Sequence, residues 1–175
     1  MSFKKILILL LIAVSVYHIY TKKWFLLSDG KIRGDIALNG LNGQVKTLDE
    51  CAGENGTMIF YMSTWCPHCA EEITRIKELQ NFLRIHKIQV LIGMYGPSND
   101  VIHKWVAKQD FPWDWKTFYW EEKFEKDFYI KDHLVPYLTT RNKKGINTFS
   151  KAGAFYTDQL TEIATQMLES NQDSK

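Results

Sequence analysis

The sequence predicts a single domain of the α/β class, and three features of the chain support this prediction. An apolar run, 57–62, leads into a Cys-x-x-Cys motif and then an amphipathic segment, an order that indicates strand, turn and helix. A second apolar run, 88–95, has the continuity of a strand buried on both faces of a sheet. A strand pattern led by Pro136 and a final amphipathic segment complete the domain.

Composition narrows the possible classes of protein. The chain has 175 residues, of which 45% are hydrophobic, enough for one ordinary core and hardly for two. Its formal net charge is only +2, and no long run of Lys or Arg suggests a basic docking stripe. We therefore expect one globular domain and no nucleic-acid partner.

The first 22 residues are predicted to anchor the chain in a membrane. Lys4 and Lys5 precede an uncharged stretch, 6–20, dominated by Ile, Leu and Val. This stretch is a little shorter than the ~20 residues that span a bilayer, but flanking lysines can lengthen it by snorkelling. Because the small-residue segment 13–15 lies inside the apolar run, we expect an uncleaved anchor and not a removed signal peptide. Basic residues on both sides of the stretch leave its orientation open.

The remaining elements follow from hydrophobic periodicity and turn residues. In chain order we expect a tether over 23–34, hairpin strands near 36–38 and 45–48, a helix from the motif to about 83, a helix over 101–109, a short helix within 121–130, strands near 134–140 and 146–149, and a helix ending near 168. The domain is expected to span 35–170, followed by a polar tail over 171–175. The aromatic stretch 111–120 is interpreted as core, with the lining of a substrate groove as the alternative.

The segment Trp65-Cys66-Pro67-His68-Cys69 is the strongest functional signal in the chain. Two cysteines separated by two residues can close a small disulfide when the second lies one helical turn after the first. The first thiol then lies at the helix N-terminus, where free N–H groups and the macrodipole favour the thiolate, which is the nucleophile in thiol–disulfide exchange. We therefore expect Cys66 to attack and Cys69 to resolve.

The two residues between the cysteines fit this interpretation. Pro67 suits the first helical position, because its φ is already helical and its missing N–H is not needed there. A protonated His68 would add positive charge beside the thiolate. A structural zinc site is the competing interpretation of one Cys-x-x-Cys motif. Such a site needs four ligands, however, and the sequence contains no second Cys-x-x-Cys or Cys-x-x-His pair, so we expect no metal.

The order strand, Cys66-Pro67-His68-Cys69 on a helix, strand, helix, Val135-Pro136 hairpin and final helix resembles the thioredoxin fold. More narrowly, it resembles the membrane-anchored TlpA-like and DsbE-like branch of that superfamily. The resemblance implies a central mixed sheet flanked by helices, an N-terminal β-hairpin extension and an N-terminal membrane anchor helix. It also implies a cis Val135–Pro136 bond against the motif, which leaves the backbone of Val135 free to pair with a substrate peptide. We expect Trp65 to contact the substrate as well.

Glu72 matches a glutamate that TlpA-like reductases carry near the active site. By this resemblance, its carboxylate accepts the proton of Cys69 when Cys69 attacks the mixed disulfide. The alternative is a solvated carboxylate on the helix face beside Glu71. Phe60 departs from the thioredoxins proper, which have a buried aspartate at the matching strand position.

The sequence thus predicts a thiol–disulfide oxidoreductase that acts on cysteine-containing protein substrates and needs no bound cofactor. By resemblance, it is a single-pass protein of the inner membrane whose catalytic domain faces the periplasm, where a membrane or soluble redox partner recharges the cysteine pair. The direction of electron flow stays open, because the pair Pro67-His68 is that of DsbA-type oxidants whereas the layout is that of reductases.

Two alternative functions remain open. The protein could be a dedicated periplasmic reductase for cytochrome c maturation, or a non-catalytic binding or chaperone module that kept the thioredoxin fold.

Cys51 makes the number of cysteines odd, and we expect a free or partly buried thiol without a catalytic role.

Overall fold

The computed structural model describes residues 30–112, 114–130 and 134–172. The predicted anchor over 1–22 and most of the predicted tether lie outside these residues. Within the described ranges, no helix combines the length and the apolar character that crossing a membrane requires.

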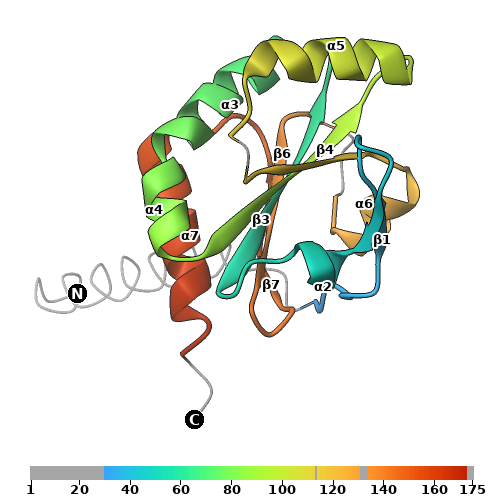
Figure 1. Cartoon of the computed structure of the whole chain (residues 1–175). Helices are drawn as coiled ribbons and strands as arrows, with labels where there is room; N and C mark the ends of the chain where they lie inside the picture. The colour runs from blue at the N-terminus through green and yellow to red at the C-terminus, as the bar shows by residue number, and fades with distance from the viewer. Residues whose placement is uncertain (1–29, 113, 131–133, 173–175) are drawn as a thin grey trace, which may run out of the picture.

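A five-stranded mixed sheet forms the centre of the domain (Figure 1). Its strands are β3 (Gly56–Ser63), β4 (Ile88–Tyr95), β5 (Lys116–Tyr119), β6 (Tyr137–Asn142) and β7 (Asn147–Ala152). Their order across the sheet is β5-β4-β3-β6-β7, in which β3 is parallel to β4 and antiparallel to β6. Because β6 is antiparallel, its first residue lies opposite the end of β3, where Tyr137 pairs with Tyr61. The loop after β3 and the segment before β6 therefore meet at one edge of the sheet.

The predicted N-terminal hairpin is confirmed. β1 (Ala37–Asn39) and β2 (Val45–Thr47) pair antiparallel, and the short helix α2 (Leu48–Cys51) follows directly. Thr47 and Glu50 form a capping box at the start of α2, which satisfies backbone N–H groups that the helix leaves free. The hairpin attaches to the edge strand β5, since the N–H of Leu41 donates to the carbonyl of Thr117 (3.2 Å).

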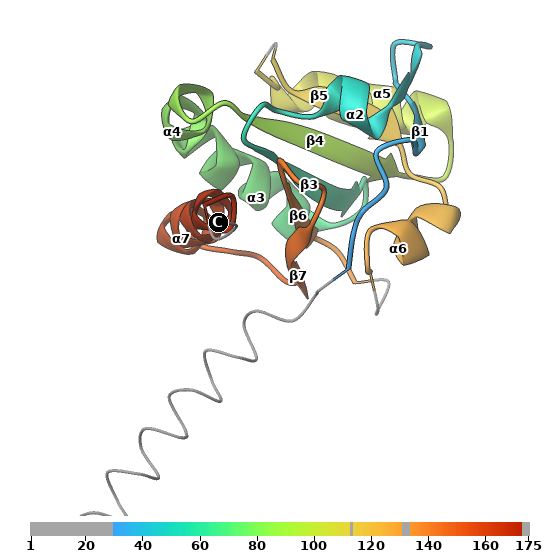
Figure 2. The ribbon, with the colours of Figure 1, turned by 90° about the horizontal axis from the view of Figure 1, so that it is seen from below.

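Helices cover both faces of the sheet (Figure 2). The longer ones are α3 (Pro67–Glu78), α5 (Asn99–Gln109) and α7 (Thr157–Glu169), and the shorter ones are α4 (Gln80–Ile85) and α6 (Lys123–Asp127). Figure 2 shows α3, α4 and α7 on one face, whereas α2, α6 and the N-terminal hairpin lie on the other.

The single helix predicted after the motif is two helices in the structure. The N–H of Leu79 bonds to the carbonyl of Ile76 (3.1 Å), three residues back, which is the tighter turn typical of a helix end. α4 then begins at Gln80. Leu79, between the two helices, and Leu83 of α4 are both buried in the core.

Alternate side chains of β3 enter two cores. Met58, Phe60 and Met62 belong to the cluster shared with α3 and α7, whereas Ile59 and Tyr61 belong to the cluster on the hairpin side. All eight residues of β3 are buried, as expected for a central strand with covered faces.

The folded body begins earlier than predicted. Ile32, inside the predicted tether, is fully buried, and its N–H donates to the carbonyl of Gly145 (2.8 Å). The guanidinium of Arg141 donates in turn to the carbonyl of Ile32 (3.1 Å). These partners come from the β6–β7 hairpin, far away in sequence. The local sequence pattern around Asp35 therefore could not show that the domain begins before that residue.

The aromatic stretch 111–120 contains a strand that the sequence-based interpretation missed. β5 pairs parallel with β4, and the aromatic residues Trp115, Phe118 and Trp120 are buried. The stretch therefore supplies core side chains, as the favoured interpretation held. Its β-favouring residues, Thr117 to Tyr119, were the available signal for a strand.

Candidate active site

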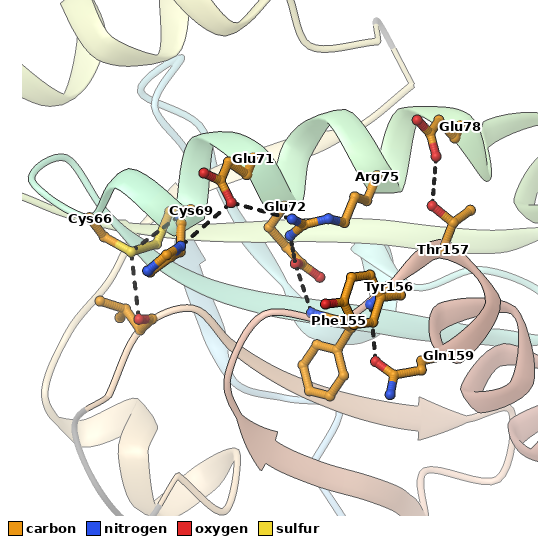
Figure 3. Close-up of polar contacts among 12 residues, drawn as sticks. Cys66, Cys69, Glu71, Glu72, Arg75, Glu78, Phe155, Tyr156, Thr157 and Gln159 are labelled. Atoms are coloured by element: carbon orange, nitrogen blue, oxygen red, sulfur yellow. Dashed lines mark hydrogen bonds and ion pairs between the residues drawn. A yellow bond between two sulfur atoms is a disulfide. The ribbon is translucent and has the colours of Figure 1, made fainter.

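The Cys-x-x-Cys motif lies where β3 passes into α3 (Figure 3). Cys66 is the N-cap of α3, with φ −88° and ψ 109°, and Pro67 is the first helical residue. The Sγ of Cys66 accepts a hydrogen bond from the backbone N–H of Cys69 (3.2 Å). The two cysteines form a disulfide with their Cα atoms 5.3 Å apart. A sulfur thus takes the capping role that Ser, Thr or Asp usually plays.

The two sulfurs are not equivalent toward solvent. Cys66 is 7% exposed and Cys69 is 0% exposed, and both residues belong to the core cluster between α3 and the sheet. Cys66 is therefore the more accessible of the two residues. This asymmetry agrees with the predicted roles of attacking and resolving cysteine.

The electrostatic setting of Cys66 favours a thiolate in the reduced state. The first turn of α3 contains no acidic residue, so the positive end of its macrodipole is not offset there. His68 is exposed, and its Nδ1 lies 3.5 Å from Oε2 of Glu71. The Glu71 carboxylate would therefore offset part of any positive charge that His68 adds near the helix N-terminus.

The segment before β6 lies against the sulfur of Cys66. The Val135–Pro136 peptide bond is cis, as predicted. The carbonyl oxygen of Val135 lies 3.5 Å from the Sγ of Cys66, and Pro136 is buried. The backbone of Val135 is therefore adjacent to the sulfur at which exchange would occur.

Exposed apolar side chains adjoin the motif and the Val135 segment. Trp65 is 60% exposed and meets Tyr95 edge-on, with ring centroids 5.4 Å apart. Tyr95 is 42% exposed and lies at the end of β4, opposite Ser63 of β3. Leu134, next to Val135, is exposed too. We refer to Trp65, Tyr95 and Leu134 as the apolar rim. Tyr95 was not among the predicted site residues, although the carboxyl ends of the neighbouring parallel strands β3 and β4 lie side by side.

Glu72 is fully buried, so the alternative of a solvated carboxylate is wrong. Its Oε2 accepts hydrogen bonds from the backbone N–H of Phe155 (3.0 Å) and from Arg75 (3.3 Å). Its Oε1 is buried without a hydrogen-bond partner among the described residues. Burial raises the pKa of Glu72, while the Phe155 amide and the Arg75 guanidinium act in the opposite direction. On α3, Glu72 lies three residues after Cys69, on the same buried side.

Phe60 is fully buried at the strand position where thioredoxins proper have an aspartate. Its ring belongs to the core cluster that contains both cysteines. Because Phe60 cannot exchange a proton, Glu72 is the buried carboxylate that α3 offers near Cys69.

Two residues that contact Glu72 were missed in the sequence. Arg75 pairs with Glu71 and Glu72, an i,i+4 and i,i+3 spacing that the sequence does display. Phe155 lies 83 residues from Glu72, and only the packing of the segment before α7 against α3 brings them together. No local signal could have indicated that contact.

Cys51 lies apart from the redox pair. It is buried at the end of α2, in the hairpin-side core cluster, and its thiol is free, as predicted. Burial raises the pKa of Cys51, which disfavours the reactive thiolate.

Together, a disulfide at the N-terminus of a helix, the full burial of its second cysteine and an adjacent cis-proline segment on this sheet define a thiol–disulfide oxidoreductase of the thioredoxin fold. The chain belongs to the AhpC/TSA family, whose sequence profile matches residues 30–117. A search of curated proteins finds no significant match.

Solved structures share the fold. A Chlorobium tepidum protein described as thiol:disulfide interchange protein DsbE is 17% identical, with a TM-score of 0.69 over 82% of this chain and 99% of that chain. A thioredoxin-like protein from Aeropyrum pernix is 15% identical, with a TM-score of 0.63 over 87% of this chain and 96% of that one. A secreted Mycobacterium tuberculosis disulfide oxidoreductase, homologous to E. coli DsbE, is 12% identical, with a TM-score of 0.60 over 75% and 95%.

Proposed function

We propose that this protein exchanges disulfides with cysteine-containing protein substrates outside the cytoplasm, with Cys66 as the attacking and Cys69 as the resolving residue. The observation that carries the proposal is the asymmetry of the pair. Cys66 caps α3 and is 7% exposed, while its disulfide partner Cys69 is fully buried.

Two displacements account for the exchange. In the first, the Cys66 thiolate attacks one sulfur of a substrate disulfide, a bond forms between the two sulfurs, and the other substrate sulfur leaves as a thiolate. In the second, Cys69 gives up its proton and attacks Cys66 Sγ, which restores the Cys66–Cys69 disulfide and releases the second substrate thiolate. The substrate is reduced by two electrons and the protein is oxidised by two. The reverse sequence oxidises a substrate dithiol.

Glu72 is proposed as the acceptor of the Cys69 proton. Both residues are fully buried on the same helix, and Oε1 of Glu72 has no hydrogen-bond partner among the described residues. A buried carboxylate with a raised pKa is a better match for a thiol proton than a solvated one, because the proton-transfer step is less uphill.

Substrate binding is proposed for the backbone of Val135 and for the apolar rim. An extended peptide that pairs with Val135 would bring its own cysteine next to Cys66, since the Val135 carbonyl already lies 3.5 Å from that sulfur. Trp65, Tyr95 and Leu134 would contact flanking apolar side chains of the substrate.

The location of the reaction is proposed from the sequence. The basic and apolar segment over 1–22 would act as a single-pass anchor in the inner membrane, with the domain on the periplasmic side and a membrane or soluble protein recharging the cysteine pair. Membrane fractionation of the full-length protein, and protease treatment of spheroplasts against lysed cells, test this placement. Digestion of the domain only after lysis would contradict it.

Trapping tests the exchange itself. Cys69→Ala should accumulate mixed disulfides between Cys66 and its substrates, which a non-reducing gel resolves and mass spectrometry identifies. Cys66→Ser should accumulate none and should lose both insulin reduction and oxidation of a cysteine peptide. Unchanged activity of Cys66→Ser in both assays would exclude the proposed function, and an absence of trapped substrates would favour the binding module.

The direction of exchange follows from the reduction potential of the pair. Equilibration against glutathione gives this potential directly. A value near that of thioredoxin, about −270 mV, corresponds to a reductase, whereas a value near that of DsbA, about −120 mV, corresponds to an oxidant. The first result would also direct the search for clients toward reductase substrates such as apocytochromes.

A further inference from the structure

Arg75 connects the buried Glu72 to the surface of α3 and to the segment before α7 (Figure 3). Its Nη1 lies 3.3 Å from Oε2 of Glu72, and its Nη2 lies 3.3 Å from Oε2 of Glu71. The guanidinium also lies over the ring of Tyr156, with 5.8 Å from Cζ to the ring centroid. One side chain thus contacts a buried carboxylate, an exposed carboxylate and an aromatic face.

We propose that Arg75 is a positioning residue that keeps Glu72 ionised and oriented to accept the proton of Cys69, and that Tyr156 holds Arg75 in this position. The inference rests on the proposed function, because it concerns the resolving step of that exchange. It assigns a role to two residues, one on α3 and one at the start of α7, that act through Glu72.

The hydrogen bonds of Glu72 fall on one oxygen. Oε2 accepts from both Arg75 and the Phe155 amide, and the two donors come from different segments. This fixes the rotation of the carboxylate and leaves Oε1 with its lone pairs unused among the described residues. A buried oxygen without a donor costs stability, so a purely structural ion pair would gain by satisfying it. A proton acceptor, in contrast, needs such a free oxygen.

The charges around Glu72 come from two elements. On its own helix, Arg75 contacts it directly, while Glu71 and then His68 lie beyond Arg75. From the segment before α7 come the Phe155 amide and the phenol ring of Tyr156. Glu71 is half exposed and therefore screened by water, so the buried Glu72 receives the larger share of the Arg75 charge.

The segment before α7 is itself held in place. The backbone N–H of Tyr156 donates to Oε1 of Gln159 (3.0 Å), and the hydroxyl of Thr157 donates to Oε2 of Glu78 (2.6 Å). The second bond joins α7 to α3 at a position six residues after Glu72. Both bonds keep the Tyr156 ring beside Arg75.

The experiment measures the resolving step as a function of pH. Full-length protein carrying a mixed disulfide between Cys66 and a thionitrobenzoate group releases that chromophore when Cys69 attacks. Arg75→Gln should slow release at neutral pH by about tenfold and move the rate profile toward higher pH, because proton acceptance by Glu72 is impaired. Arg75→Lys should restore most of the rate. Arg84→Gln is the matched control, because it removes an exposed guanidinium of α4 that pairs with Asp114.

The outcomes separate this inference from the proposed function. If Arg75→Gln has the same profile as Arg84→Gln, the role of Arg75 is excluded while exchange by Cys66 stands. If the wild type itself releases no chromophore and exchanges with no substrate, the proposed function fails. Glu72→Gln combined with Arg75→Gln should be no slower than Glu72→Gln alone, and additive losses would overturn the inference. Should Arg75→Gln not fold, Tyr156→Leu carries the test, with a smaller shift in the same direction.

Discussion

The carbonyl oxygen of Val135 lies 3.5 Å from the Sγ of Cys66, although 69 residues separate them in the sequence. The antiparallel pairing of β6 with β3 produces this contact, because it brings the start of one strand to the end of the other. The reactive sulfur is therefore enclosed on one side by backbone and bordered elsewhere by the apolar rim.

Loss of the apolar rim should weaken protein binding more than chemistry. We expect Trp65→Ala and Tyr95→Ala to raise KM for a protein substrate several-fold each, since buried aromatic area is lost from the complex. Turnover of a small disulfide such as oxidised glutathione should change little. Ile85→Ala is the control, because Ile85 is an exposed apolar residue just before β4 begins, whereas Tyr95 lies where β4 ends. Equal effects on large and small substrates would rule out a binding role.

Glu72→Gln should slow resolution and yet stabilise the fold at neutral pH. Burial raises the pKa of Glu72 above its ordinary value, so the folded state binds this proton more tightly than the unfolded state. The stability contribution is complete below the ordinary pKa of a glutamate and is lost as pH rises through the folded pKa. The gain from Glu72→Gln should therefore appear near pH 7 and shrink toward about pH 4. Urea unfolding at both pH values, in oxidised protein, measures it. A gain that does not depend on pH would contradict this assignment.

Cys51 should be dispensable for exchange. Its thiol is buried and burial raises its pKa, so alkylation of reduced native protein should label Cys66 quickly and Cys51 only after unfolding. Cys51→Ala should retain full exchange activity and lose about 1 kcal/mol of unfolding free energy through lost packing. Peptide mapping after alkylation in buffer and in urea provides the check. Rapid labelling of Cys51 in buffer would show that its pocket opens readily.

The segment before Asp35 should be part of the stable domain. Ile32→Ala is expected to reduce the free energy of unfolding by about 2–4 kcal/mol, because a fully buried side chain is truncated. Val45→Ala, an exposed aliphatic position on the hairpin, should change it by less than about 0.5 kcal/mol. Chemical denaturation of both variants decides this. If both substitutions had equally small effects, the segment before Asp35 would belong to the tether and not to the stable domain.

Much of the fold could be predicted from the sequence because it is encoded locally. The apolar run before the motif, the proline at the first helical position and the three- and four-residue periodicity of α3 each depend on neighbouring residues. The same holds for the cysteine pair, since a two-residue gap at a helix start brings both sulfurs together. β5 escaped prediction because its four residues lie inside a longer aromatic stretch, which was interpreted as core without regard to its β-favouring residues.

The sequence by itself therefore determined the kind of chemistry, namely a nucleophilic cysteine at a helix N-terminus with a second cysteine within disulfide reach. Only the tertiary structure decided which of the two neighbouring carboxylates on α3 is buried. Glu71 and Glu72 are identical side chains at adjacent positions, yet one is exposed and the other is fully buried beneath the Phe155 amide. The physical reason is that burial depends on which face of α3 meets the sheet and α7. That packing joins segments 83 residues apart, so no local pattern contains it.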